Sequence, residues 1–172
     1  MLRTAALLLA GFFCAGIGFL KSASLSGRVR DLNALRKILR FLKGEISFAS
    51  TTIPDAFWKI GARMDDPYRD FLQDLSEDLG RMDGETFSEI FSKNVDCHLK
   101  ETSLTPEDKK ELKEFGAGMG YLDRSMQIAN LEHYDTCLKH KTEELMNGLP
   151  TKKKLFQSLG VMGGLFLVLL FW

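Results

Sequence analysis

The chain has 172 residues, in which 23 Lys and Arg are balanced by 23 Asp and Glu. Without a basic excess it lacks the charge of a nucleic-acid-binding domain, so we expect no nucleic acid partner. The length allows one modest core once two very apolar ends are set aside. Cys14, Cys97 and Cys137 follow no framework spacing. We interpret them as reduced thiols, consistent with a cytoplasmic setting.

The first apolar end covers residues 4–20, which carry no charge and are bracketed by Arg3 and Lys21. A helix of that length reaches about 26 Å, which predicts a short transmembrane helix. The alternative is a cleaved signal peptide ending at the small residues 22–24. Seven basic residues against one acid between positions 21 and 43 favour a retained span, because such a cluster resists translocation. Small residues that would let a second helix approach recur at every fourth position: Ala6, Ala10, Cys14 and Gly18.

The next segment has a heptad pattern that predicts a long helix following the first span. Its apolar residues are Leu32, Leu35, Leu39, Leu42, Ile46 and Ala49. Arg36, Arg40 and Lys43 form a basic stripe, which we place opposite the leucines. This stripe is either a solvated face near anionic lipid headgroups or a docking surface for a partner.

Shorter helices with clear start signals are predicted in the middle of the chain. Pro54 suits a first helical position, and Asp66-Pro67 supplies an N-cap and first residue for a helix that ends at Gly80. A further helix follows Asp83-Gly84. Thr105-Pro106 caps and opens the next one, which runs into the glycine-rich residues 116–120. No strand signal is present, so we expect an all-α bundle of about six helices.

An acidic region extends from position 65 to position 89, with nine acids against two bases. Asp70, Asp74 and Glu77 align on one face of the predicted helix. The face is either simply solvated or a membrane-distal surface that steers a basic partner.

The last predicted bundle helix carries an apolar stripe over 131–149 and stops at Gly148 and Pro150. Residues 155–172 are again without charge, follow three lysines and predict a second transmembrane helix. Gly160 and Gly164 form a GxxxG that would pack against the first span or a partner's helix. Both basic clusters face the central domain, residues 21–154. We therefore predict a two-span protein of the cell membrane, with this domain in the cytoplasm and both termini outside.

The residues that could carry chemistry do not form a recognisable site. The glycines at 116, 118 and 120 follow no strand and lack a Walker lysine, so a tight helix–helix joint that uses the backbone freedom of glycine is expected instead. His133, Cys137 and His140 share a helical face, and Cys97-His98 could complete a zinc site, but the spacing matches no common module. We predict no catalytic residue, no metal and no cofactor.

Several motifs resemble one known family. They are Arg28-x-x-x-Leu32-x-x-Leu35, Leu42-x-x-Glu45-Ile46, Ile53-Pro54, the block from Leu112 to Arg124 and Ser158-Leu159-Gly160. Together with the position of both apolar ends, they resemble the stage III sporulation protein AB family over essentially the whole chain. The Phe-Gly…Gly…Asp-Arg block is the most specific part of the resemblance.

The resemblance implies a role in the channel-like apparatus that links mother cell and forespore. The family's soluble domain looks like the cytoplasmic domain of the type II secretion and type IV pilus platform protein, which couples a cytoplasmic ATPase to membrane machinery. The expected partners are membrane lipid, a companion ATPase and other membrane proteins of the complex on the mother-cell side, with a homo-oligomer as a further possibility. Two alternatives stay open: a membrane tether or lipid-binding helical protein, and a membrane-bound thiol or metal enzyme.

Overall fold

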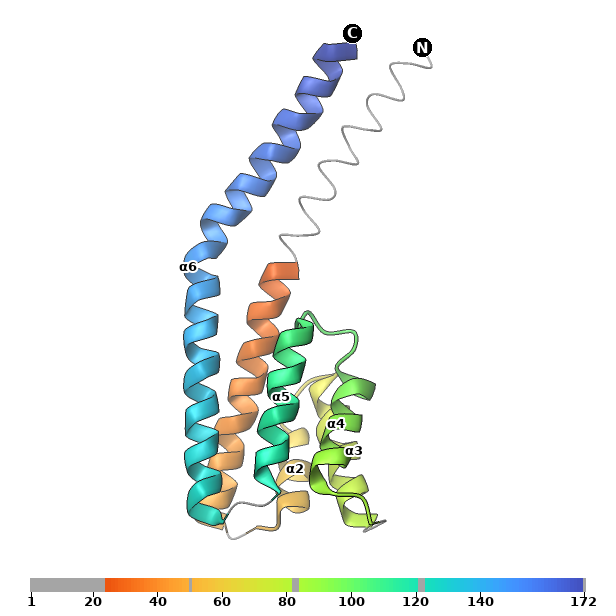
Figure 1. Cartoon of the computed structure of the whole chain (residues 1–172), viewed down its shortest axis with the longest axis vertical. Coiled ribbons are helices and arrows are strands. Elements are labelled where there is room, and N and C mark those ends of the chain that lie inside the picture. The colour runs from red at the N-terminus through yellow and green to blue at the C-terminus, as the bar shows by residue number, and fades with distance from the viewer. Residues whose placement is uncertain (1–23, 50, 82–83, 121–122, 172) are drawn as a thin grey trace. The chain divides into compact units, whose positions relative to one another are not determined.

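The computed structural model describes the chain except residues 1–23, 50, 82–83, 121–122 and 172. It also leaves out the side chains of residue 49 and of residues 149–171, apart from Ser158 and Met162. Within these residues every regular element is helical, as predicted (Figure 1). A first helix covers residues 24–44 and continues into the π-helical turn η1 (Glu45–Ala49). The others are α2 (Ile53–Gly61), α3 (Tyr68–Arg81), α4 (Phe87–His98), α5 (Pro106–Met119) and α6 (Arg124–Phe171).

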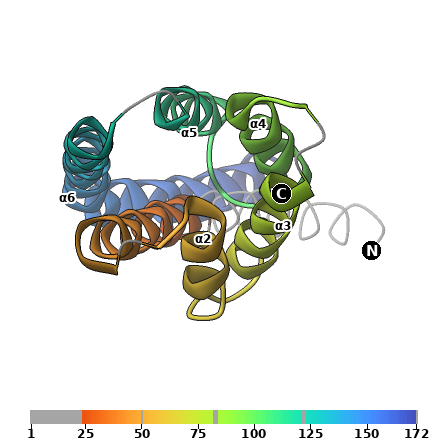
Figure 2. The same cartoon turned by 90° about the horizontal axis from the view of Figure 1, so that it is seen from below.

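The chain divides into two compact units. One unit is Arg30–Thr142 and contains the helical bundle, whereas the other combines the two ends of the chain, Met1–Val29 and Glu143–Trp172. Seen from below, the helices of the bundle surround a common core (Figure 2). The first helix and the initial part of α6 are antiparallel neighbours joined by ion pairs.

Side-chain caps fix where three of the helices begin. Thr52 accepts from the N–H of Asp55 at the start of α2, while Thr86 and Thr105 each form a reciprocal capping box at the start of α4 and α5. Such caps pair backbone N–H groups that the first helical turn leaves unsatisfied. The predicted start of α5 is therefore confirmed.

Three predicted helix boundaries differ from the structure, two of them by a single residue. α3 begins at Tyr68 and ends at Arg81, and the carbonyl of Asp65 accepts the first helical bonds in place of a cap at Asp66-Pro67. α6 does not stop at Gly148 and Pro150 but continues to Phe171. A proline removes only one backbone donor, so neighbouring residues can keep a long helix intact through it.

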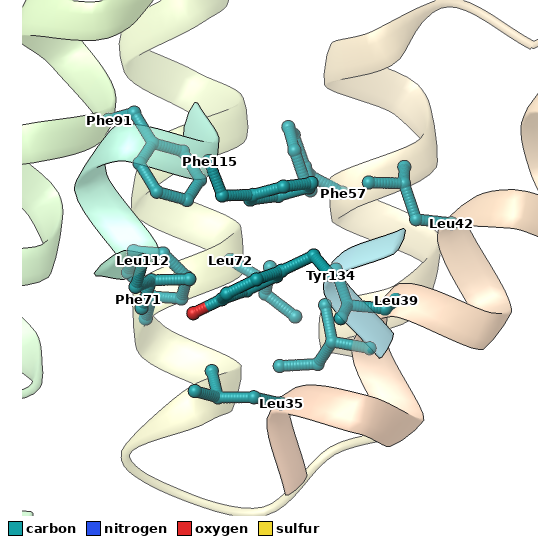
Figure 3. Close-up of a pocket in the computed structure, with 11 residues that line it drawn as sticks. Leu35, Leu39, Leu42, Phe57, Phe71, Leu72, Phe91, Leu112, Phe115 and Tyr134 are labelled. Atoms are coloured by element: carbon teal, nitrogen blue, oxygen red, sulfur yellow. The ribbon is translucent and has the colours of Figure 1, made fainter. Parts of the chain in front are cut away.

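The core is organised by a row of aromatic rings that connects α3, α4, α5 and α6. Phe91 contacts Phe71 and Phe115 edge to face, with ring centroids 5.7 and 6.5 Å apart, and Phe115 stacks on Tyr134 at 4.8 Å. Eleven residues enclose an apolar cavity of about 20 Å³ beside this row (Figure 3). The Tyr134 hydroxyl is buried and has no hydrogen-bond partner among the described residues. Burial raises the pKa of that hydroxyl well above its usual range.

The glycine-rich segment of α5 serves close packing and not the backbone freedom that was predicted. Gly116 lies inside the helix, and Gly120 has the ordinary helical φ of −74°. A Cβ at Gly116 would lie 2.7 Å from Cγ and Cε1 of Phe91, and one at Gly120 would lie 3.0 Å from Cβ of Phe87. The two glycines therefore let α4 pack directly on the backbone of α5.

Among the described residues, no helix is both long and apolar enough to cross a membrane. The predicted span at 4–20, with Ala6, Ala10 and Gly18, lies outside the described residues. Side-chain packing at Gly160 and Gly164 also lies outside the described part of the chain.

Candidate partner-binding surfaces

The predicted basic stripe faces α6 and is not opposite the leucines. Arg36 Nε lies 2.9 Å from Asp135 Oδ1, and Lys43 Nζ lies 2.6 Å from Glu132 Oε1. Arg40 Nε approaches the second oxygen of Asp135 at 3.5 Å. The Arg36 side chain is only 13% exposed, so its charge is committed to this contact. The stripe therefore joins two helices of the bundle, and only Arg40 and Lys43 remain accessible at its edge.

The predicted acidic row on α3 remains at the surface. Asp70, Asp74 and Glu77 are all exposed. Asp74 Oδ2 lies 3.0 Å from Nε2 of His98, and Glu77 lies 3.8 Å from Arg81. Among the described residues Asp70 has no ion-pair partner. The row is thus available to a partner, with Asp70 the least neutralised member.

A second basic surface was missed by the sequence analysis. Lys37 Nζ and Arg63 Cζ lie 5.7 and 5.6 Å from the centroid of the Phe41 ring. Within the described part of the chain, neither cation has a carboxylate within ion-pair distance, and Lys37 donates only to the carbonyl of Arg63. We call Lys37, Phe41 and Arg63 the cation–aromatic cluster. The sequence could have predicted that Lys37 and Phe41, four residues apart, share a helical face. It could not have predicted that Arg63 lies beside them, because that depends on how α2 packs on the first helix.

Two long-range polar contacts fix α5 and the turn before it to the long helices. Asp31 is buried and accepts from the backbone N–H of Ser103 at 2.7 Å. Lys141 Nζ donates to Asp108 Oδ1 at 3.0 Å and to Glu111 Oε2 at 2.7 Å. Burial alone would lower the pKa of Lys141, but these hydrogen bonds to Glu111 and Asp108 outweigh it and raise that pKa. The ammonium group is therefore held charged between the two helices.

The described thiols and the imidazoles of His133 and His140 lie at the surface. Cys137 and Cys97 are exposed, and Sγ of Cys137 is 3.8 Å from Nε2 of His133. No group of three or more potential metal ligands occurs among the residues that the structure describes. That the protein has no metal or cofactor stays a prediction.

Comparison with known proteins agrees with the motifs noted in the sequence. The model of the family described as stage III sporulation protein AB matches residues 3–172. The chain belongs to this family. A relative, stage III sporulation protein AB of Bacillus subtilis (strain 168), is 28% identical over 155 residues, which cover 89% of each chain. A solved structure of a stage III sporulation protein AB superposes with a TM-score of 0.65 and 21% identity, covering 72% of this chain and 97% of the other. That structure supports the same helical fold.

Proposed function

We propose that this sporulation-family protein is a non-catalytic scaffold, anchored in the cell membrane by its two apolar ends. In this proposal the bundle faces the cytoplasm of the mother cell and couples a companion ATPase to membrane partners of a secretion-like channel complex. The main support is membership of the stage III sporulation protein AB family over residues 3–172. The charge-free ends, each flanked by basic residues toward the centre, support the two-span topology.

The contacts between the long helices suit a part that transmits force. Arg36 pairs with Asp135 between the first helix and α6, and Lys141 joins α6 to Asp108 and Glu111 of α5. A buried pair with good geometry is costly to break, because separation leaves an uncompensated charge. Displacement of the bundle would therefore move both long helices together. Such a coupled pair is suited to pass movement toward the chain ends.

The acidic tip, which we define as Glu77 and Glu85 beside the turn from α3 to α4, offers a site for a basic face of the ATPase. Both side chains are exposed. The end of α3 and the start of α4 lie at the end of the bundle where η1 ends and α6 begins (Figure 1). Opposite charges on the two proteins would accelerate their association and make it sensitive to salt.

Binding of the companion ATPase to the full chain in lipid nanodiscs tests the coupling role. E77K/E85K should weaken binding about tenfold, and raising the ionic strength should have a similar effect. E101K, which reverses an exposed charge in the turn between α4 and α5, is the matched control. An ATPase that does not bind the wild-type chain in nanodiscs would contradict the coupling role.

The topology has a separate test. In intact cells Cys97 should resist a membrane-impermeant thiol reagent, and a cysteine placed after Trp172 should react. Cys97 is exposed in the bundle, so protection would come from the membrane and not from burial. Labelling of Cys97 from outside would show that the bundle is not cytoplasmic.

A further inference from the structure

The cation–aromatic cluster is an accessible surface whose charges the bundle itself does not neutralise. Lys37 and Arg63 both lie within 6 Å of one Phe41 ring, so two like charges converge on the same small area. The nearest comparable stripe, Arg36 with Lys43, is already paired with carboxylates of α6. Convergent cations beside a half-buried ring favour an acidic partner that also presents an aromatic group.

The acidic row on α3 has those complementary properties. Asp70 and Asp74 are exposed there. Ser76 of α3 donates to the carbonyl of Pro54, which places this side of α2 against α3. Trp58 follows Pro54 by one helical turn and is 48% exposed, so its ring lies on the same side of α2. The α3 surface thus carries Asp70, an exposed acid that has no ion-pair partner among the described residues, and the exposed indole of Trp58 lies on the neighbouring helix α2.

The two surfaces lie at the same level along the bundle. The Tyr68 hydroxyl donates to the carbonyl of Asp31, which sets the start of α3 beside residue 31 of the first helix. Ser76 lies beside Pro54, just beyond the end of the first helix, so α3 and the first helix run in the same direction. Asp74 follows Tyr68 by six residues, and Lys37 follows Asp31 by six. Both therefore lie about 9 Å further along the same axis.

From this arrangement we infer that copies of the chain associate side by side, with the cation–aromatic cluster of one copy on the Asp70–Asp74 surface of the next. The chain has 23 basic and 23 acidic residues, so its copies carry no net charge that would make them repel one another. Because the two surfaces differ, the contact is head to tail, and its repetition about an axis along the bundle gives a ring where the rotation between copies closes. Copies related in this way share one orientation, as two-span anchoring requires.

A lipid surface fits this cluster less well. If residues 4–20 span the membrane, as in the proposed function, the headgroups lie before residue 24, where the first helix begins, and Lys37 and Phe41 lie roughly 20–25 Å further along that helix. That separation exceeds the Debye length of about 8 Å at physiological ionic strength. The cluster is therefore too far from headgroups for their charge to hold it, whereas a neighbouring copy presents its acids at the same level.

Sedimentation or light scattering of the full chain in detergent micelles tests the inference. We expect concentration-dependent association at low salt that weakens as salt is raised. K37E/R63E should weaken it at least about tenfold, and so should D70K/D74N, in which the new amide at position 74 keeps an acceptor for His98. K110E and E101K, exposed on α5 and in the turn before it, are matched controls and should associate like the wild type.

Mixing the two charge variants provides the sharpest readout. K37E/R63E retains the acidic surface and D70K/D74N retains the cluster, so the mixture should form hetero-complexes although each variant alone does not. Helix content by far-UV circular dichroism confirms that both are folded. A monomeric wild type, association that both variants leave unchanged, or a mixture without hetero-complexes would overturn the inference. So would loss of binding to anionic vesicles by K37E/R63E with self-association unchanged. ATPase binding in nanodiscs, which uses Glu77 and Glu85, distinguishes failure here from failure of the proposed function.

Discussion

Replacing Gly116 by alanine is the most direct test of how α4 and α5 pack. The new Cβ would lie 2.7 Å from Cγ and Cε1 of Phe91 and closer still to Cδ1, whereas ordinary contact begins near 3.4 Å. Phe91 is 3% exposed and is held by Phe71 and Phe115, and the apolar cavity of about 20 Å³ that it lines is too small to take up the displaced ring. The helices must separate or the ring must leave its place.

Two opposing terms set the size of the effect. Overpacking a core costs about 1–3 kcal/mol, and the need for a shift of more than half an ångström against a fixed ring places this site at the upper end. Alanine in a helix interior regains about 1 kcal/mol relative to glycine. We therefore expect Gly116→Ala to lower the free energy of unfolding by about 1–2 kcal/mol, or the melting temperature by roughly 3–6 °C.

Chemical and thermal unfolding of the full chain in detergent, followed by far-UV circular dichroism, measures this change. Gly118→Ala is the matched control, because its Cβ would meet only the end of the Asn130 side chain at 3.3 Å. It should be neutral or stabilising by up to about 1 kcal/mol. Combining Gly116→Ala with Phe91→Leu should reduce the cost of the alanine. A Gly116→Ala protein at least as stable as the wild type would refute the close-approach explanation.

Three further changes test the polar contacts by the same unfolding measurements. Asp135→Ala should destabilise the chain by about 3 kcal/mol, because it leaves Arg36 largely buried without its partner; a loss below about 0.5 kcal/mol would show that the pair is dispensable. Tyr134→Phe should be neutral or stabilising by up to about 1 kcal/mol, since it removes a buried hydroxyl that has no partner in the described part of the chain. A clear loss of stability would point to a partner for that hydroxyl. Hydrogen bonds from the backbone and side chain of Thr86 lower the pKa of Glu89 in the folded chain. The stability that Glu89 contributes should therefore be fully present above the pKa of about 4.3 that it has in the unfolded chain. It should be lost as the pH falls through the lower pKa of the folded chain. Glu89→Gln should remove that part of the pH dependence, and an unchanged pH profile would contradict it.

Local signals predicted most of the fold, because they depend on near neighbours in the chain. The heptad leucines of the first helix and the Thr105-Pro106 start of α5 lie where the sequence placed them. Pro150 predicts the end of a helix, but the loss of one backbone donor does not end a helix of 48 residues. The sequence pattern gives the free-energy cost of a proline inside a helix. It does not show whether the other contacts of a long helix offset that cost.

The candidate surfaces were harder to predict because their partners are distant in sequence. Arg36 and Asp135 are separated by 99 positions, and an arginine at the edge of an apolar stripe looks the same whether it faces solvent or a neighbouring helix. Glu132 and Asp135 beside Leu131 were the available signal for a complementary acidic edge. The helical spacing alone predicted the acidic row on α3, because these residues are exposed and their position requires only that they share one face of the helix.

The carboxylate of Asp108 has a consequence for how the bundle assembles. One of its oxygens accepts from the N–H of Thr105 at the start of α5, and the other accepts from Lys141 of α6. Formation of the first turn of α5 and docking of α6 therefore share a single side chain. Each step lowers the entropic cost of the other, since the carboxylate is ordered only once. Asparagine could cap the helix but would leave the charge of the ammonium group to Glu111, and glutamate would carry its own charge on a longer side chain. We therefore expect both Asp108→Asn and Asp108→Glu to lower the free energy of unfolding. Either change should also reduce the cooperativity of unfolding.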